Sequence, residues 1–164
     1  MRRDSRLSRM LHVLIHMDRF GGAMTSDMIA RMLDTNPVVV RRTMAGLRDA
    51  GYVRSEKGHG GGWVIIRPLP EITFLDIHNA LGNPSIFALG VAVEHPECLV
   101  EQAVNAALGS SFDAAEKLLL ERFASVTLAD LATDVDQRWP TEPDGKWTGP
   151  GSIFEHLPQS GDTE

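Results

Sequence analysis

The sequence predicts a mainly α-helical fold with one small β-hairpin. Three observations lead to this prediction. Apolar residues recur at helical spacing over the first 50 residues, two short runs of β-forming residues then flank a glycine-rich segment, and helix-capping signals return after residue 70. A chain of 164 residues is long enough to bury a core without disulfides or a structural metal.

Two helices are predicted before residue 35. Residues 5–20 carry apolar side chains at positions i, i+3, i+4, i+7 and i+8, the spacing of an amphipathic helix, and two glycines follow. A second helix is expected to begin near Thr25 and Ser26 and to run to Leu33. Three turn-forming residues then separate it from the next helix.

A third helix is predicted over residues 37–50. Asn36 suits its N-cap, and Pro37 suits its first position. The helical period buries three of its side chains, those of Val40, Met44 and Leu47. Four other side chains in its N-terminal half then project away from the core: Val38, Val39, Arg41 and Arg42.

A β-hairpin is predicted after the third helix, with strands over residues 52–55 and 63–66. The loop between them, residues 56–62, has four glycines among five consecutive residues, so its backbone can approach another surface closely. The loop lacks the Lys-Ser/Thr pair of a phosphate-binding loop and does not precede a helix, so we expect no nucleotide there.

Helical patterns return in the second half of the chain. Thr73 and Asp76 form a capping-box-like start for a short helix that runs to residue 81. Two longer stretches are expected to follow, from about Pro96 to residue 108 and over residues 111–124, with an interruption at Gly109–Ser110.

Thr127 and Asp130 are expected to cap a last short helix that ends near Asp136, and a flexible tail rich in proline and glycine follows. We therefore predict three regions, a DNA-binding domain, a helical dimerisation and signal region, and the tail: 1–70, 71–136 and 137–164.

Charge is distributed unevenly along the chain, whose overall formal charge is −6. Residues 1–70 hold 12 Lys and Arg against 6 Asp and Glu, a net +6. Residues 71–164 hold 4 Lys and Arg against 16 Asp and Glu, a net −12. This asymmetry favours a basic N-terminal half that faces a polyanion.

Composition excludes several classes of protein. The single cysteine rules out an internal disulfide and fits the reducing cytoplasm, where we expect the protein to act. No apolar run is long enough to span a membrane, and no spacing of Ser, His and Asp suggests an enzyme. His12 and His16 have a metal-binding spacing, but no third ligand of matching type lies near in sequence, so we expect no metal.

Two short helices joined by a tight turn and followed by a glycine-rich hairpin predict a winged helix-turn-helix. The second helix of such a pair can enter the major groove of DNA, where arginine binds guanine edges or phosphates and valine packs on thymine methyl groups. The same fold also serves as a protein–protein interaction module without DNA readout. The basic N-terminal half and the exposed arginines count against that alternative.

Residues 36–68 resemble the Rrf-two (Rrf2) family of bacterial transcriptional regulators. The pattern L-R-x-A-G, followed by V-x-S-x-x-G-x-G-G-G-aromatic behind a helix-turn-helix, carries the resemblance. It extends over about residues 5–135 and looks most like the YwnA-like branch, which lacks an iron–sulfur cluster. The resemblance implies a homodimer in which helices after the hairpin, residues 96–124, cross those of a partner.

The resemblance also assigns residues to the DNA contact. The recognition positions fall on Val38, Arg41 and Arg42, the wing residue that enters the minor groove on Lys57, and the next wing position on His59. With the helix starts included, the candidate DNA-binding residues are Thr25, Ser26, Asn36, Val38, Val39, Arg41, Arg42, Lys57 and His59.

Cluster-binding members of the family carry three cysteines after the wing, and here Cys98 alone fills the last of these positions. The position of an additional histidine ligand falls on Glu101. One thiolate per chain cannot hold an iron–sulfur cluster, so we expect no cofactor.

Cys98 is either a sensor of oxidants or electrophiles or a small buried apolar residue. Nearby glutamates disfavour its thiolate, whereas His95 and an adjacent helix start favour it. The sequence thus predicts a dimeric, sequence-specific regulator that binds double-stranded DNA and responds to a signal that the sequence does not identify. We expect it to be a repressor, with an activator as the alternative.

Overall fold

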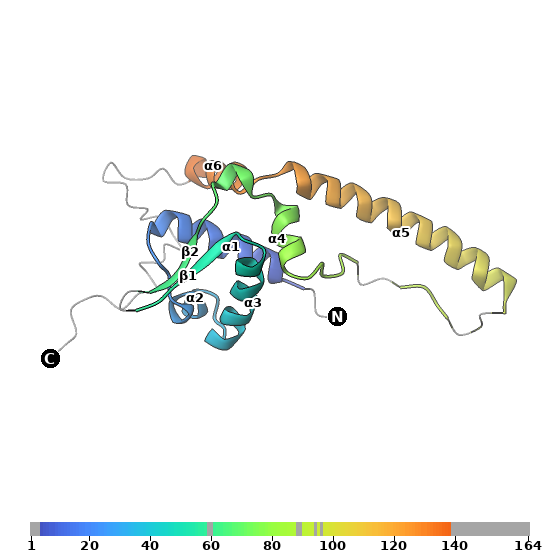
Figure 1. Cartoon of the computed structure of the whole chain (residues 1–164). Coiled ribbons are helices and arrows are strands. Elements are labelled where there is room, and N and C mark those ends of the chain that lie inside the picture. Colours follow the sequence, from blue (N-terminus) through green and yellow to red (C-terminus); the bar gives the residue numbers. More distant parts are fainter. Residues whose placement is uncertain (1–3, 59–60, 88–89, 94, 96, 139–164) are drawn as a thin grey trace.

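The computed structural model describes residues 4–138 except 59–60, 88–89, 94 and 96. It consists of a compact body from which one long helix projects (Figure 1). The body contains three helices, a two-stranded antiparallel sheet and two further helices: α1 (Arg6–Phe20), α2 (Ser26–Met32), α3 (Pro37–Asp49), β1 (Val53–Glu56), β2 (Gly62–Ile65), α4 (Phe74–Ala80) and α6 (Leu128–Arg138). The predicted fold class is confirmed.

Helix α1 lies at the centre of the body. Its predicted apolar stripe is buried from Met10 onward, but Val13, His16 and Met17 are buried as well. The wider burial follows from its neighbours, because α4, α6 and β2 all pack against it. The helix ends as expected at Gly21, which adopts a left-handed conformation with φ 66°.

The hairpin pairs Val53 with Ile65 and Glu56 with Gly62, each strand one residue away from its predicted bounds. A backbone bridge also joins Met24, just before α2, to Trp63 in β2, with N···O distances of 3.0 and 2.8 Å. A Cβ atom on Gly62 would lie 2.6 Å from the Met24 carbonyl, so this close approach requires glycine. The bridge fixes the hairpin to the helix-turn-helix.

Two similar caps join α4 to α6. Thr73 and Asp76 form the predicted capping box at the start of α4, and Thr127 and Asp130 make the same reciprocal hydrogen bonds at the start of α6. The two threonines form an antiparallel bridge, so both helices begin side by side. A short 3-10 turn, Leu69–Glu71, precedes α4 and was not predicted.

The long helix α5 (Leu99–Ser125) corrects the prediction of two helical stretches. It is continuous over 27 residues and does not break at Gly109–Ser110. One glycine costs a helix only about 1 kcal/mol relative to alanine, and α5 as a whole is rich in alanine, leucine and glutamate, which are good helix formers. The hydroxyl of Ser111 donates to the carbonyl of Ala107 at 2.9 Å within the same helix. The helix begins at Leu99 rather than at Pro96, with Cys98 in the N-cap position.

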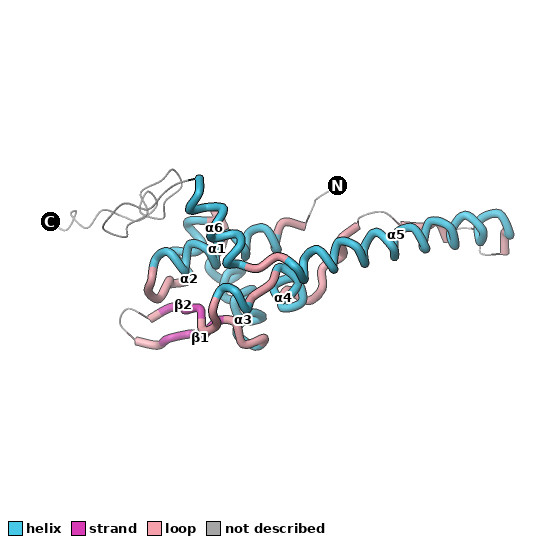
Figure 2. Tube along the Cα trace, turned by 90° about the horizontal axis from the view of Figure 1, so that it is seen from above, coloured by secondary structure: helices cyan, strands magenta, loops and turns pink. Residues whose placement is uncertain are grey.

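Helix α5 is attached to the body at its C-terminal end. The ring of Phe123 lies 6.3 Å from that of Phe74 and 6.1 Å from that of His78, both on α4. From there the helix extends away from the body, and both views show the same arrangement (Figures 1 and 2). At 1.5 Å per residue it is about 40 Å long. We call residues 99–118 the arm.

The arm exposes a row of apolar side chains. None of the residues in α5 is buried, and five of them are large apolar side chains with exposed fractions from 41% to 78%: Leu99, Val100, Val104, Leu108 and Leu118. None of the helices in the described part of the chain is both long and apolar enough to cross a membrane. The predicted tail, residues 137–164, lies almost entirely outside the described residues.

Candidate nucleic-acid interface

Helix α3 presents an exposed ridge on the outside of the body. Asn36 caps the helix, because its Oδ1 accepts a hydrogen bond from the Val38 backbone N–H at 2.7 Å. Val40, Met44 and Leu47 are buried as predicted. Val38 and Val39 are 61% and 52% exposed, and Arg41 and Arg42 are exposed beside them. We call these four residues the α3 ridge.

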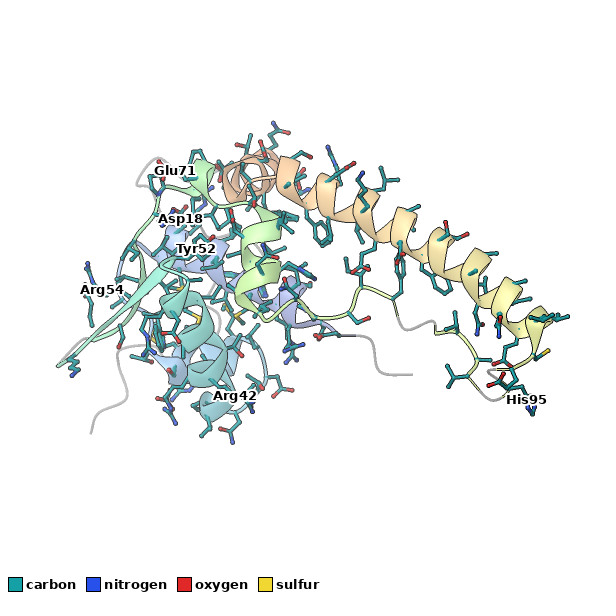
Figure 3. The ribbon with its side chains drawn as sticks, turned by 45° about the vertical axis from the view of Figure 1, so that its right-hand side comes forward. Asp18, Arg42, Tyr52, Arg54, Glu71 and His95 are labelled. Atoms are coloured by element: carbon teal, nitrogen blue, oxygen red, sulfur yellow. The ribbon has the colours of Figure 1, made fainter. Side chains whose placement is uncertain are left out.

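The two arginines of the α3 ridge are not paired with any other described side chain. Neither Arg41 nor Arg42 forms an ion pair or a side-chain hydrogen bond with any described residue. In contrast, Arg48 pairs with Asp49 and Arg54 pairs with Glu56 nearby. Figure 3 shows Arg42 at the lower end of α3, on the side of the body away from Glu71. These guanidinium groups are therefore free to bind an anion.

Helix α2 supports α3 and the hairpin. Thr25 caps α2, since its hydroxyl oxygen accepts from the Met28 N–H at 3.1 Å. The hydroxyl of Ser26 accepts a hydrogen bond from the indole nitrogen of Trp63 at 3.0 Å. Asp34 makes the tight turn between α2 and α3 with φ 48°. Three predicted DNA-binding residues thus accept a hydrogen bond within the protein through a side-chain oxygen: Thr25, Ser26 and Asn36.

The hairpin extends beside α2 with its charged side chains exposed. Lys57 is exposed at the end of β1, as a wing contact requires. Arg54 is also exposed, and its Nη2 lies 2.7 Å from the Glu56 carboxylate. Arg54 was not among the predicted DNA-binding residues, although the alternation along β1 places it on the outer face. His59 lies outside the described residues.

A polar contact links the corner between α3 and β1 to α4. Partial burial of Tyr52 and its hydrogen bond to Asp76 raise the pKa of the phenol. Partial burial opposes ionisation of Asp76, but hydrogen bonds from Thr73 and Tyr52 outweigh it and lower the pKa of the carboxyl. Arg67 lies 5.5 Å from the centre of the Tyr52 ring and donates through Nε to the Gly51 carbonyl at 3.1 Å. This contact could not be predicted from the sequence, because Tyr52 and Asp76 are far apart in the chain.

Cys98 lies at the far end of the arm and is exposed, unlike the buried apolar residue that was the alternative. His95, labelled in Figure 3 near the end of the arm, donates its backbone N–H to the two carboxylate oxygens of Glu101 at 3.1 and 3.2 Å. The chain has one cysteine, and no group of three His, Cys, Asp or Glu side chains among the described residues is arranged to hold a metal. This donor set does not fit an iron–sulfur cluster.

The described elements define a winged helix-turn-helix protein with a helical arm. The chain belongs to the Rrf2 family, because the family model, described as an iron-dependent transcriptional regulator, matches residues 3–134. The predicted family membership is confirmed, and the class is that of transcriptional regulators rather than enzymes.

Individual relatives agree with this assignment. The chain is 29% identical over 130 residues to YwnA of Bacillus subtilis, a protein named as an HTH-type transcriptional regulator, covering 78% of this chain and 95% of YwnA. A crystal structure described as a transcriptional regulator from Lactobacillus plantarum superposes with a TM-score of 0.67 at 21% identity, covering 80% of this chain and 90% of that one. A crystal structure described as a DNA-binding protein gives a TM-score of 0.58 at 28% identity, covering 77% of this chain and 98% of that one.

Proposed function

We propose that this protein is a homodimeric, sequence-specific DNA-binding regulator of transcription. The observation that carries the proposal is the pair of arginines on the exposed α3 ridge that form no ion pair with a described residue. Their neighbours Val38 and Val39 expose apolar side chains that a folded protein ordinarily buries. A surface that combines free guanidinium groups with exposed methyl groups matches the edges of bases in a major groove.

The arrangement of the ridge and the hairpin supports the same docking. The N-terminal half of the second helix in a helix-turn-helix enters the major groove, which is about 12 Å wide. Arg41 and Arg42 then contact guanine edges or phosphates, and Val38 contacts a thymine methyl group. Lys57, exposed on the hairpin, reaches the adjacent minor groove. The crystal structure at 28% identity that is described as that of a DNA-binding protein supports this proposal.

The arm supports the dimeric part of the proposal. Its exposed leucines and valines form a row that a monomer leaves in water. Pairing two arms buries both rows and holds two α3 ridges over one DNA site, so that a dimer reads two half-sites. Within residues 96–124, the range that the family resemblance assigns to this contact, Leu99, Val104 and Leu118 are exposed. Phe123 instead packs on α4 within the chain.

The signal and the direction of regulation complete the proposal. We place the response to oxidants or electrophiles on Cys98, because its thiol is exposed at the end of the arm that would pair. Repression in the cytoplasm is the proposed outcome. A dimer bound at a promoter blocks RNA polymerase by occupying the site, and it needs no further contact surface to do so.

The test is selection of bound genomic fragments by the purified full-length protein, followed by mobility shifts on the selected sites. The double variant Arg41→Ala, Arg42→Ala is expected to lose selective retention. Arg138→Ala is a control for the loss of an exposed arginine away from the ridge, because Arg138 lies on α6, where it pairs with Asp134. If the wild-type protein retains no fragment selectively, DNA readout is wrong and the protein-interaction module becomes the better interpretation.

A further inference from the structure

We propose that Arg6, at the start of α1, is a further phosphate-binding residue on the flank of α3 opposite the hairpin. The inference rests on the proposed DNA-binding function and extends it to the second backbone strand of the major groove. Arg6 is far from α3 in the sequence, and only the fold brings it beside the α3 ridge.

Two open hollows lie along the two flanks of α3. The hollow on the hairpin side has a volume of about 310 Å³, and its lining includes Arg41, Thr25 and Gly58. The hollow on the other side has a volume of about 440 Å³, and its lining includes Arg6, Arg42 and Thr43. A helix in a major groove has one DNA backbone on each side. Insertion of the α3 ridge therefore brings one backbone toward each hollow.

The charges that line the two hollows differ. The hairpin-side hollow combines Arg41 with the carboxylates of Asp27 and Glu56. The opposite hollow combines two guanidinium groups, those of Arg6 and Arg42, and none of the described residues in its lining carries a carboxylate, although Asp4 pairs with Arg6 beside it. A phosphate is therefore stabilised more strongly in the hollow that Arg6 lines.

Asp4 orients the guanidinium of Arg6 without occupying all of it. The Asp4 carboxylate accepts hydrogen bonds from Nε at 2.9 Å and from Nη2 at 2.6 Å. These bonds lower the pKa of Asp4, so the carboxylate stays ionised and the pair stays formed at neutral pH. The Arg6 side chain is 53% exposed, and Nη1 takes part in none of its described hydrogen bonds. This nitrogen remains available to a phosphate.

The position of the hollow is fixed by the contact between α3 and α4. A Cβ atom at Gly46 would lie 2.7 Å from the backbone oxygen of Ala80, so the two helices touch at this glycine. Both residues line the hollow. Arg6 and Arg42 are therefore held along one edge by packed helices rather than by a loop, and this edge can set the register of the protein on DNA.

The test measures the affinity of full-length Arg6→Ala at several salt concentrations, on a DNA site selected by the wild-type protein and on a scrambled duplex of equal length. The variant is expected to bind both DNAs more weakly by the same factor. The slope of log K against log salt should fall by about 1 for each half-site. Arg6→Lys keeps the charge and should keep the wild-type slope, and Arg138→Ala is the control for an exposed charge elsewhere.

Each outcome decides the inference separately from the proposed function. If Arg6→Ala keeps the wild-type slope while Lys57→Ala lowers it, Arg6 does not bind phosphate, and the proposed function stands. If Arg6→Lys loses the slope as Arg6→Ala does, the role of Arg6 is structural and the inference is also overturned. If the wild-type protein binds neither DNA, the proposed function itself fails.

Discussion

The indole nitrogen of Trp63 and the hydroxyl of Ser26 lie 3.0 Å apart and join β2 to the first residue of α2. Trp63 also shares two backbone hydrogen bonds with Met24, and its side chain is only 7% exposed. One residue thus fixes the hairpin to the helix pair through both its backbone and its side chain. The hairpin is therefore fixed relative to the α3 ridge, the two surfaces that we propose contact DNA.

Substitution of this residue should therefore destabilise the body. Trp63→Phe removes the indole donor and part of a buried side chain, so we expect the free energy of unfolding to fall by about 1–3 kcal/mol. Ser26→Ala removes the same hydrogen bond without shrinking the core and should cost about 1 kcal/mol. Urea unfolding measures both values. Equal losses in the two variants would show that the core packing of Trp63 contributes nothing beyond the hydrogen bond.

The α3 ridge and the hairpin should contribute differently to DNA binding. Arg42→Ala should weaken binding to the selected site by about 1–3 kcal/mol if the guanidinium reads a base edge. Lys57→Ala should weaken binding to all sequences more evenly, with a shallower salt dependence, because it meets phosphates and the minor groove. Titrations on the selected and scrambled duplexes separate these effects. Unchanged affinity in both variants would remove these residues from the interface.

The apolar row on the arm should determine the oligomeric state. Placing carboxylates in the row with Val104→Asp and Leu108→Asp should convert a dimer into a monomer at micromolar concentration, because two like-charged rows then face each other. Ala106→Asp is the matched control. Ala106 is exposed and lies two residues from both sites, about 200° around the helix. Light scattering gives the mass, and a monomeric wild-type protein would contradict the arm-pairing proposal.

Oxidation should act through Cys98. Peroxide oxidises the exposed thiol to a sulfenic acid with release of water, and this sulfenic acid can condense with the Cys98 thiol of a second chain to a disulfide with release of a second water. We expect wild-type binding to the selected site to weaken after peroxide treatment, whereas Cys98→Ser should be unaffected. Mobility shifts before and after treatment, with a thiol reductant added back, measure the difference. Equal binding before and after treatment of the wild-type protein would exclude Cys98 as the sensor.

The capping box of α4 should make stability depend on acid. The pKa of Asp76 is lowered in the folded protein, so its contribution is complete above the unfolded value of about 3.9 and is lost as pH falls through the folded value. Asp76→Ala should therefore lower stability by about 1 kcal/mol at pH 7 and by less near pH 3. Thermal unfolding at both pH values measures this change. An equal loss of stability at both pH values would contradict a role for the Asp76 carboxylate in the cap.

Local signals were sufficient to predict most of the body. Capping residues such as Asn36 and Thr73, and the buried period of α3, depend on neighbours within a few positions. They predicted helix starts and the ridge that faces outward. Contacts that the fold creates were not predictable in this way. The bond between Trp63 and Ser26 joins residues 37 apart, and the hollow shared by Arg6 and Arg42 requires the packed arrangement of α1, α3 and α4.

The error at Gly109–Ser110 has a related cause. Glycine in a sequence often marks a helix end, but its cost of about 1 kcal/mol is small against the many hydrogen bonds of a long helix. The surrounding alanines and leucines decide the outcome. Sequence periodicity could not show that α5 makes few contacts with the body of the protein. The number of these contacts depends on where α5 separates from α4.

The attachment of α5 at Phe123 has a mechanical consequence. A rod about 40 Å long whose contact with α4 lies near one end behaves as a lever, and a tilt of about 10° at that end moves the other end by about 7 Å. Packing adjustments of a fraction of an ångström around the Phe123 ring can therefore become large displacements of the far end of α5. When two such helices are joined, these displacements are comparable to two base-pair steps. Conversely, a small chemical change beside Leu99 is transmitted along α5 to the Phe74 and His78 rings, where the helix joins the body.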